Sequence, residues 1–333
     1  MLTVTSCGGA ARATSGAPSR PPVPRSAEAR LGPDQATLYT DGAGATAALL
    51  GAVNAAQRTI DAEIYEFDRR DLVEAMLAAT RRGVSVRMVG DPTVGGTVTT
   101  GHRLAAAGAL VSFFPVGPRQ IDHVKLLVID GRVAFFGGVN WGAHSYLNHD
   151  FELRLEGPAA ARLEHLFSVD MQRSGRPVLV TPAPAAVDGE PALLTSLPAD
   201  EIGRAVLAVV EGARHSIEVE MFVLTDAATI RALQAAARRG VTVQALFDPG
   251  QDLNQAAIAL LRPAGVRCRF YRSSGEKLHA KVAVIDGDLL VMGSANWTAS
   301  GFRHNHELDA VLTNARIAAA AAARMDDDWS AAG

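Results

Sequence analysis

Two segments of the chain place a histidine and a lysine two positions apart. They are His123-Val-Lys125 and His279-Ala-Lys281. On a β-strand, side chains two positions apart project from the same face, so each pair would present an imidazole beside an ammonium group. An imidazole can act as a nucleophile or carry a proton, and an ammonium group can anchor a phosphate oxygen. The spacing therefore predicts phosphate chemistry, with His123, Lys125, His279 and Lys281 as catalytic residues.

An aspartate follows each lysine at the same distance, Asp130 in the first segment and Asp286 in the second. Asp130 has the opposite strand parity from His123 and lies about 23 Å further along an extended chain, so it cannot orient that histidine. Both aspartates precede a glycine, and Asp-Gly is typical of a two-residue hairpin turn. We interpret Asp130 and Asp286 as structural residues of the motif.

A hairpin at each Asp-Gly pair would bring the following residues back beside the histidines. With a two-residue loop, Gly138 and Ser294 fall opposite the two histidines, and Asn140 and Asn296 lie just beyond them. Amide and hydroxyl groups can donate hydrogen bonds to phosphate oxygens. We therefore expect Asn140, Asn296 and Ser294 to bind the substrate phosphate.

The duplicated segments belong to a repeat that runs along most of the chain. Three earlier pairs of segments match at a constant separation of 157 positions (222 − 65, 238 − 81 and 248 − 91). The matching segments are 58–65 with 215–222, 81–86 with 238–243, and 91–92 with 248–249. The chain is therefore interpreted as two copies of one domain, residues 35–178 and 198–333, joined by a linker at 179–197.

Each copy alternates between strand-like and helix-like segments. In the first copy, an apolar, β-branched run at 59–67 precedes an amphipathic stretch at 72–82. Gly83 supplies the left-handed residue that ends many helices, and 84–89 is typical of a further strand. This order predicts an α/β fold in which helices cover both faces of a mostly parallel sheet, an α/β/α sandwich. Two such domains are expected to pack about a pseudo-two-fold axis.

Residues 1–34 are predicted to be a disordered tail or tether, because 8–34 are mostly Ala, Gly, Ser, Pro and Arg. Within this tail, Val4-Thr-Ser-Cys7-Gly8 resembles a bacterial lipobox, although too few residues precede it for a signal peptide. Two localisations stay open. One is an extracytoplasmic lipoprotein anchored through Cys7, if translation starts further upstream; the other is a cytoplasmic or peripheral membrane protein.

The overall composition excludes several classes of protein. The 333 residues are 48% apolar and 20% charged, with a net charge of −3, unlike a general DNA-coating protein. Cys7 and Cys268 are the only cysteines, which excludes a disulfide framework and a cysteine-built zinc site. No run of about 18 apolar residues is present, so no membrane-spanning segment is expected.

The pattern H-x-K-x4-D followed by G-[GS]-x-N, present twice, resembles the phospholipase D superfamily. The resemblance implies a phospholipase D-like domain in each copy, with both half-sites in one monomeric chain. It also implies that Asp150 and Glu307 each hydrogen-bond a motif histidine. Their neighbours His149 and His306 alternate away from them and are expected to be bystanders. No metal or other cofactor is expected, because no metal-ligand spacing recurs on one helix face.

Two imidazoles facing one phosphodiester suggest a two-step displacement through a phosphohistidine intermediate. The resemblance favours His123 as the nucleophile and His279 as the general acid. The symmetry of the two copies by itself leaves these roles interchangeable.

Details of the first copy favour a phospholipid substrate at a membrane surface. Gly137-Gly138 and the segment 150–158 are similar to bacterial cardiolipin synthases, which implies a phospholipase D or a phosphatidyltransferase. The alternative is a metal-independent endonuclease acting on DNA or RNA. A non-enzymatic scaffold is disfavoured because both copies retain their motif residues. Trp141 and Trp297 either contact acyl or glycerol groups or pack in the core.

Overall fold

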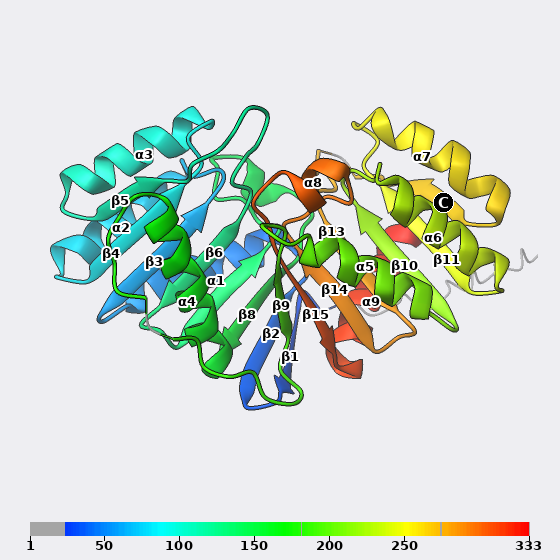
Figure 1. Ribbon diagram of the computed structural model, residues 1–333, viewed down its shortest axis with the longest axis horizontal. Helices are drawn as coiled ribbons and strands as arrows, with labels where there is room; N and C mark the ends of the chain where they lie inside the picture. Colours follow the sequence, from blue (N-terminus) through cyan, green and yellow to red (C-terminus); the bar gives the residue numbers. More distant parts are fainter. Residues whose placement is uncertain (1–23, 181, 274, 333) are drawn as a thin grey trace, which may run out of the picture.

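In the computed structural model, residues 24–180, 182–273 and 275–332 are described, and they form two β-sheets with helices packed on them (Figure 1). Cys7 and most of the expected tail lie outside the described residues. The two halves of the chain form two wings on either side of a central, approximate two-fold axis (Figure 1). Equivalent strands and helices follow the same order in both wings, as the repeat predicts.

The first half forms an eight-stranded sheet in the order β1-β2-β8-β7-β6-β3-β4-β5. The strands are β1 (Ser26–Leu31), β2 (Asp34–Tyr39), β3 (Thr59–Ile64), β4 (Ser85–Gly90), β5 (Leu110–Phe113), β6 (Lys125–Ile129), β7 (Val133–Gly137) and β8 (Glu152–Glu156). The helices are α1 (Gly42–Ala55), α2 (Arg70–Arg81), α3 (Gly95–Ala106), the 3-10 helix η1 (Ser145–Leu147) and α4 (Pro158–Arg173).

The second half forms a seven-stranded sheet in the order β12-β11-β10-β13-β14-β15-β9. The strands are β9 (Ala192–Thr195), β10 (Ser216–Met221), β11 (Thr242–Phe247), β12 (Arg267–Phe270), β13 (Lys281–Ile285), β14 (Leu289–Gly293) and β15 (Leu308–Thr313). The helices are α5 (Glu201–Gly212), α6 (Ala227–Arg238), α7 (Leu253–Leu261), the 3-10 helix η2 (Arg262–Ala264), α8 (Ala299–Arg303) and α9 (Ala315–Ala331).

Both sheets are mixed, which corrects the expectation of a mostly parallel sheet. β3, β4 and β5 are parallel, but β6 runs antiparallel to β3, and β7, β8, β2 and β1 continue the antiparallel pattern. The second sheet repeats this arrangement around β10 and β13. The direction reverses between β3 and β6 and between β10 and β13, and the tight hairpins β6–β7 and β13–β14 continue the antiparallel pairing.

The Asp-Gly pairs form the predicted hairpin turns. Asp130 and Gly131 both have positive φ, 54° and 66°, which is the backbone conformation that favours Asp-Gly in such turns. The Asp130 carboxylate accepts backbone N–H groups of residues 57–59 at 2.7–3.0 Å, and this ties the turn to the start of β3. Asp286 makes the equivalent bonds with the N–H groups of residues 214–216.

The register of the hairpin differs by one residue from the prediction. Ile129 pairs with Val133 rather than with Arg132, so three residues separate the paired positions. The second hairpin has the same register. Gly138 and Ser294 therefore do not fall directly opposite the motif histidines, because the third loop residue shifts the returning strand by one position.

The domain boundaries also differ from the prediction. Ser26–Leu31, expected within the disordered tail, form β1, which pairs with β2 and packs against α9. Ala192–Thr195, expected within the linker, form β9, which pairs with β15. Composition did not indicate either strand, because strand formation depends on partners that are distant in sequence.

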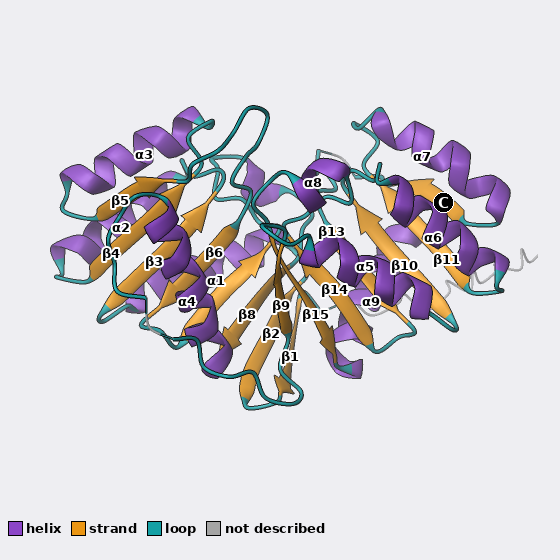
Figure 2. Cartoon of the chain, viewed as in Figure 1, coloured by secondary structure: helices purple, strands orange, loops and turns teal. Residues whose placement is uncertain are grey.

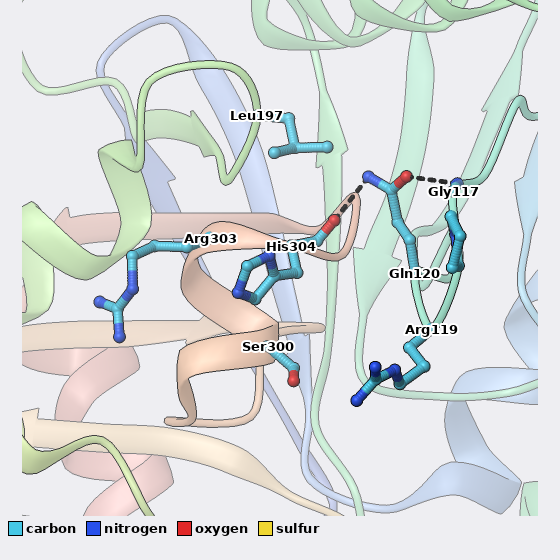
Figure 3. A pocket seen from close by; sticks show the side chains of 8 residues that line it. Gly117, Arg119, Gln120, Leu197, Ser300, Arg303 and His304 are labelled. Atoms are coloured by element: carbon cyan, nitrogen blue, oxygen red, sulfur yellow. Dashed lines mark hydrogen bonds between the residues drawn. The ribbon is translucent and has the colours of Figure 1, made fainter.

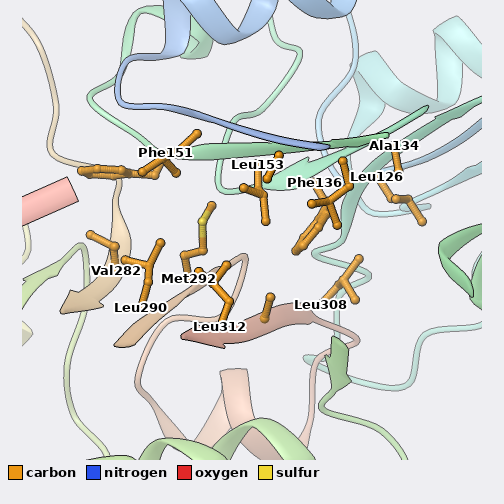
Figure 4. Packing of buried hydrophobic residues seen from close by; sticks show 14 of the residues in the cluster. Leu126, Ala134, Phe136, Phe151, Leu153, Val282, Leu290, Met292, Leu308 and Leu312 are labelled. Atoms are coloured by element: carbon orange, nitrogen blue, oxygen red, sulfur yellow. The ribbon is translucent and has the colours of Figure 1, made fainter. Parts of the chain in front are cut away.

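Both faces of β6, β7, β13 and β14 are buried, and their sequences are almost continuously apolar. In β6, Leu127 packs with the outer helices α1–α3, whereas Leu126 points towards the other sheet. The inner faces of the two sheets share one core with α4 and α9, in which Phe136 of the first sheet faces Met292 of the second (Figure 4). This shared core sets where the loops at the ends of the two sheets meet.

Helices also cover the outer face of each sheet (Figure 2). α1, α2 and α3 pack on the first sheet, and α5, α6 and α7 pack on the second. None of the helices in the described part of the chain is long and apolar enough to cross a bilayer.

Candidate active site

The two motif histidines meet in one site between the halves of the chain. His123 and His279 stand two residues before β6 and β13, and their ring centroids are 6.5 Å apart at an interplanar angle of 67°. Both side chains are nearly buried. The backbone N–H of His123 donates to the carbonyl oxygen of His306 at 2.8 Å, and that of His279 donates to His149 at 2.8 Å. The prediction that each half contributes one histidine to a shared site is therefore confirmed.

Each of these histidines is paired with a carboxylate from the other half of the chain. Nδ1 of His123 lies 2.8 Å from Oε2 of Glu307, and Nδ1 of His279 lies 2.6 Å from Oδ2 of Asp150. An ionised carboxylate can only accept a hydrogen bond, so each neutral ring carries its proton on Nδ1 and donates it to the carboxylate. Nε2 of each ring therefore keeps the lone pair that a nucleophile or a base requires.

The surroundings of Glu307 correct the role expected for Ser294. The Ser294 hydroxyl donates to Oε2 of Glu307 at 2.6 Å, and Asn305 Nδ2 donates to Oε1 of the same carboxylate at 3.1 Å. Ser294 thus donates its only hydroxyl proton to the carboxylate that pairs with His123. This proton is not available to a phosphate oxygen in this arrangement. The hydroxyl of Ser294 instead fixes the position of the Glu307 carboxylate.

The two lysines of the motif are buried beside their histidines. Lys125 is 1% exposed and Lys281 is 2% exposed. Nζ of Lys125 donates to the carbonyl oxygen of His123 at 2.5 Å, and Nζ of Lys281 donates to the carbonyl oxygen of His279. Nζ of Lys281 also lies 2.9 Å from Nδ1 of His279. Each ammonium group is thus held against the histidine two residues before it.

Burial lowers the pKa of all four of these side chains. The pKa of His123 is lowered by burial, with a further contribution from Lys125. Burial and the neighbouring charge of Lys281 lower the pKa of His279 to about 3. The pKa of Lys125 falls to about 7 and that of Lys281 to about 8, again chiefly through burial. Both imidazoles are therefore neutral at pH 7, and the lysines titrate close to it.

Asp150 and Glu307 stay ionised although both are buried. Burial acts to raise the pKa of each carboxyl, but Lys281 and His279 lower the pKa of Asp150 below its usual value. The pKa of Glu307 is likewise lowered by His123 and its neighbours, against the effect of burial. Two carboxylates and two protonated lysines balance in charge, so an incoming phosphodiester would find ammonium groups that are already oriented.

Asn140 and Asn296 follow strands β7 and β14 at equivalent positions of the two halves. The amide oxygen of each is buried and has no hydrogen-bond partner among the described residues. A buried polar group without a partner is unusual in a folded protein. Rotating the amide by 180° exchanges its oxygen with its NH₂ group, so each side chain can present a donor to an anion.

Two aromatic residues that the motifs did not indicate flank the histidines. The ring of Tyr65 lies 4.9 Å from that of His123, and the ring of Phe222 lies 4.8 Å from that of His279. The same rings lie 5.2 Å and 5.4 Å from Nζ of Lys125 and Lys281. Tyr65 and Phe222 occupy matching positions of the repeat, and this match was the available signal.

Two aspartates of the repeat also support the site. Asp91 accepts the backbone N–H of Asp122 at 2.6 Å, immediately before the first motif histidine. Asp248 accepts the backbone N–H of Leu278, immediately before the second. Both aspartates occupy matching positions of the repeat, and this match was the available signal for their role.

His149 and His306 were expected to be bystanders that alternate away from their neighbours, and their rings do point away from the motif histidines. Both are buried, and each ring is inserted among acidic side chains of the other half of the chain. Two groups of potential ligand atoms result, in each of which the atoms lie within 4.8 Å of one another. They are His149, Glu220 and Asp328, and His306, Glu63 and Asp170. By residue type, these groups could hold a metal ion.

A pocket of about 510 Å³ opens between the two halves beside the site (Figure 3). Gln120 closes one side of it, because its amide NH₂ donates to the carbonyl oxygen of His304 at 2.5 Å and its oxygen accepts the Gly117 N–H at 2.7 Å. The pocket is lined by Gly117, Pro118, Arg119, Gln120, Leu197, Ser300, Arg303 and His304. The motif histidines do not line it; it flanks the loop that leads into His123.

The two motif tryptophans pack in the core, so the core alternative is confirmed. Trp141 and Trp297 are each 1% exposed. Trp141 packs edge to face against Phe67 at 5.3 Å. Neither indole is placed to contact a lipid chain at the surface.

The chain resembles known proteins along most of its length. It is 26% identical over 314 residues to the probable cardiolipin synthase YwiE of Bacillus subtilis, covering 83% of this chain and 62% of that protein. It is 30% identical over 250 residues to cardiolipin synthase A of Pseudomonas putida, covering 69% of this chain and 52% of that protein. This chain thus spans between half and two thirds of the length of these relatives.

Solved structures support the fold. The crystal structure of phosphatidylserine synthase from Haemophilus influenzae matches 88% of this chain and 85% of its own, with a TM-score of 0.69 at 11% identity. A family model described as "Cardiolipin synthase, PLD-like domain" matches residues 49–171 and 206–329, once in each half. With the duplicated motif and the crosswise site between the halves, these matches show that the chain belongs to the cardiolipin synthase, PLD-like family.

Proposed function

We propose that this chain is a phospholipid phosphodiesterase or phosphatidyltransferase that works through a phosphohistidine. The observation that carries the proposal is the pair of neutral imidazoles, 6.5 Å apart, each oriented by a carboxylate of the other half. Two groups of this kind can act on opposite sides of one phosphorus atom, one as nucleophile and the other on the leaving group.

In the first step, Nε2 of His123 attacks phosphorus, a P–N bond forms, and the P–O bond to the leaving alcohol breaks. A proton on Nε2 of His279 passes to the departing oxygen, so the alcohol leaves in neutral form. Lys125 and Lys281, with the amides of Asn140 and Asn296, neutralise the charge on the remaining phosphoryl oxygens.

In the second step, Nε2 of His279 takes a proton from an acceptor hydroxyl, and the acceptor oxygen attacks phosphorus. The P–N bond breaks, and its electron pair returns to His123, so both imidazoles regain their starting state. Water as the acceptor gives hydrolysis, and an alcohol such as the head group of a second lipid gives transfer. Both acceptors compete for the same intermediate.

The low pKa of His279 is consistent with its role as an acid only if the substrate changes its surroundings. A phosphodiester carries a negative charge, and a nearby anion favours the protonated form of imidazole and of ammonium. Substrate binding would therefore raise the pKa of His279 and of both lysines. The proton for the leaving group would be taken up together with the substrate.

A phospholipid is the favoured substrate because the relatives at 26% and 30% identity are cardiolipin synthases by name. The test is incubation with phosphatidylglycerol vesicles and, separately, with DNA and RNA, followed by product analysis. We expect phosphatidic acid in water alone, and a transferred lipid in proportion to added glycerol or phosphatidylglycerol. Cleavage of nucleic acid with lipid left intact would replace this proposal with the nuclease alternative.

Trapping identifies the nucleophile. With a phospholipid labelled in its phosphatidyl group, we expect an acid-labile, base-stable label on the peptide that contains His123. The variant H279A should accumulate this label, because it lacks the group that activates the second acceptor, and H123A should carry none. Label on His279 alone would exchange the two roles. No label in a single turnover, with inversion at phosphorus, would mean direct attack by water.

A further inference from the structure

His149 immediately precedes the carboxylate that orients His279, and its ring is buried in the second half of the chain. Nε2 of His149 lies 2.9 Å from Oε2 of Glu220 on β10 and 3.2 Å from Oδ2 of Asp328 on α9. The ring stacks on Tyr271 at 5.4 Å with an interplanar angle of 9°. One fully buried side chain of the first half is thus inserted into the second half.

His306 makes the reciprocal insertion into the first half. Nε2 of His306 lies 3.0 Å from Oδ2 of Asp170 on α4 and 3.5 Å from Oε1 of Glu63 on β3, and its ring stacks on Phe114 at 4.5 Å. His306 likewise precedes the carboxylate, Glu307, that orients His123. The same arrangement, a buried histidine inserted among carboxylates of the other half, therefore occurs twice, at equivalent positions of the repeat.

We infer that His149 and His306 are positioning residues. Each is the first residue of a dipeptide, His149-Asp150 or His306-Glu307, and that dipeptide fixes the catalytic histidine of the opposite half. The His149 carbonyl accepts the N–H of His279, and the carboxylate of Asp150 accepts Nδ1–H of the same ring. One dipeptide thus holds both the backbone and the side chain of one catalytic group. This inference rests on the proposed function only in naming His123 and His279 as the catalytic pair.

The charged groups around the rings of His149 and His306 indicate that each ring donates hydrogen bonds to carboxylates and does not bind a metal ion. The pKa of His149 is raised to about 10, because Glu220 and Asp328 outweigh the opposing effect of burial. The guanidinium of Arg324 lies 2.9 Å from Asp328 and 3.4 Å from the second ring nitrogen of His149. A divalent cation at this place would stand beside a guanidinium, which is unfavourable in a buried site.

The second ring has a comparable environment. Burial opposes protonation of His306, but hydrogen bonding to Asp170 and the charge of Asp122 raise its pKa above the usual value. Arg173 lies 3.4 Å from Asp170 and completes the set of charged groups around this ring. Nε2–H of each buried histidine therefore always has a carboxylate to which it can donate.

Variants at one ring separate its hydrogen bond from its packing. H149F retains the stack on Tyr271 but has no donor, whereas H149Q retains a donor near the position of Nε2 but not the aromatic ring. The readout is the low-field Nδ1–H resonance of each catalytic histidine in protein labelled with ¹⁵N-histidine. H123A and H279A assign the two resonances, and the exposed His215, replaced in H215Q, is the matched control.

We expect H149F to shift or broaden the His279 resonance and to leave that of His123 unchanged, with recovery in H149Q. H306F should do the reverse, with recovery in H306Q. Turnover should fall about 10- to 100-fold in kcat with little change in KM, as for a misplaced catalytic group. If H149F does not fold, D328N removes one acceptor with the histidine in place, and a smaller shift of the same resonance is expected.

Equal shifts of both resonances, or none in folded H149F or in D328N, would overturn the inference. It would also be overturned by a stoichiometric metal ion in the purified wild-type protein that H149F or H306F loses. The resonances do not depend on the substrate. Absence of lipid turnover together with crosswise shifts would therefore reject the proposed function and retain the positioning role.

Discussion

Glu307 and His123 are 184 positions apart in the chain, yet Oε2 of Glu307 lies 2.8 Å from Nδ1 of His123. The reciprocal pair, Asp150 and His279, spans 129 positions at 2.6 Å. Neither half of the chain therefore contains both a motif histidine and the carboxylate that pairs with it. The site forms only when the two sheets are packed together, so the shared core in Figure 4 is needed to assemble it.

Replacing either carboxylate by its amide should lower turnover without unfolding the protein. In E307Q, the amide NH₂ can donate to Nδ1 of His123, which favours the tautomer that carries its proton on Nε2 and cannot attack. We expect kcat to fall about 10²- to 10⁴-fold for E307Q and D150N, by analogy with other oriented histidines. E211Q, at an exposed position of α5, is the control. Turnover within twofold of the wild type in E307Q would contradict the assignment.

Gly138 and Ser294 should differ in their sensitivity to substitution. A Cβ atom at Gly138 would lie 2.0 Å from Oδ1 of Asp150, so G138A should displace the carboxylate that orients His279. S294G removes one hydrogen bond to Glu307 but adds no clash. We therefore expect G138A to lower kcat more than S294G does. Gly51, in α1, has open space around it, and G51A should retain full activity and gain up to about 1 kcal/mol in stability.

The pH profile of kcat/KM should fall on the alkaline side of neutrality. In the proposed mechanism, Lys125 and Lys281 bind the phosphodiester in their protonated form, and their pKa values in the free protein are about 7 and about 8. As the pH rises through this window, first one ammonium group and then the other is lost, so kcat/KM decreases. On the acid side, the lowered pKa of His123 keeps the nucleophile neutral to below the usual value of 6.5. A profile that rises between about pH 7 and 9 would contradict this account.

Chelation should leave the activity unchanged. In the proposed mechanism, two buried ammonium groups neutralise the charge on the phosphoryl oxygens, so no metal ion is needed for that purpose. Turnover is measured before and after dialysis against EDTA, with metal content determined in parallel. Loss of activity that zinc or magnesium specifically restores would show that the reaction requires a metal ion.

Asp130 should matter for stability and not for chemistry. D130N weakens three hydrogen bonds from backbone N–H groups to a charged acceptor, and because the turn is partly exposed we expect a loss of about 1–2 kcal/mol in the free energy of unfolding. Burial acts to raise the pKa of Asp130, but these N–H groups lower it overall, so its contribution is lost as the pH falls through that lowered value. Denaturant unfolding and turnover are measured on the same samples. A D130N protein of wild-type stability without activity would contradict the structural role.

Features that depend on a few neighbouring residues were predictable. The Asp-Gly turns need positive φ at two consecutive positions, and the structure has it at Asp130 and Gly131. Gly83, with φ of 86°, follows the end of α2 as predicted. The one-residue error in the hairpin register arose because turn residues alone do not determine how many residues the loop retains.

The sequence by itself determined the duplication, the two His/Lys pairs and the hairpins that carry them, because these features are written in local spacing and backbone preference. Tertiary structure alone decided that Asp150 serves the histidine of the other half, that Ser294 supports Glu307, and that β1 and β9 join the sheets. It also decided the lowered pKa values of the motif histidines and lysines, because these side chains are buried only when the two sheets close over the site. The physical reason is that these effects act over different distances along the chain. Conformational preference acts over a few neighbouring residues, whereas burial and charge pairing act between distant segments that only the packed core brings together.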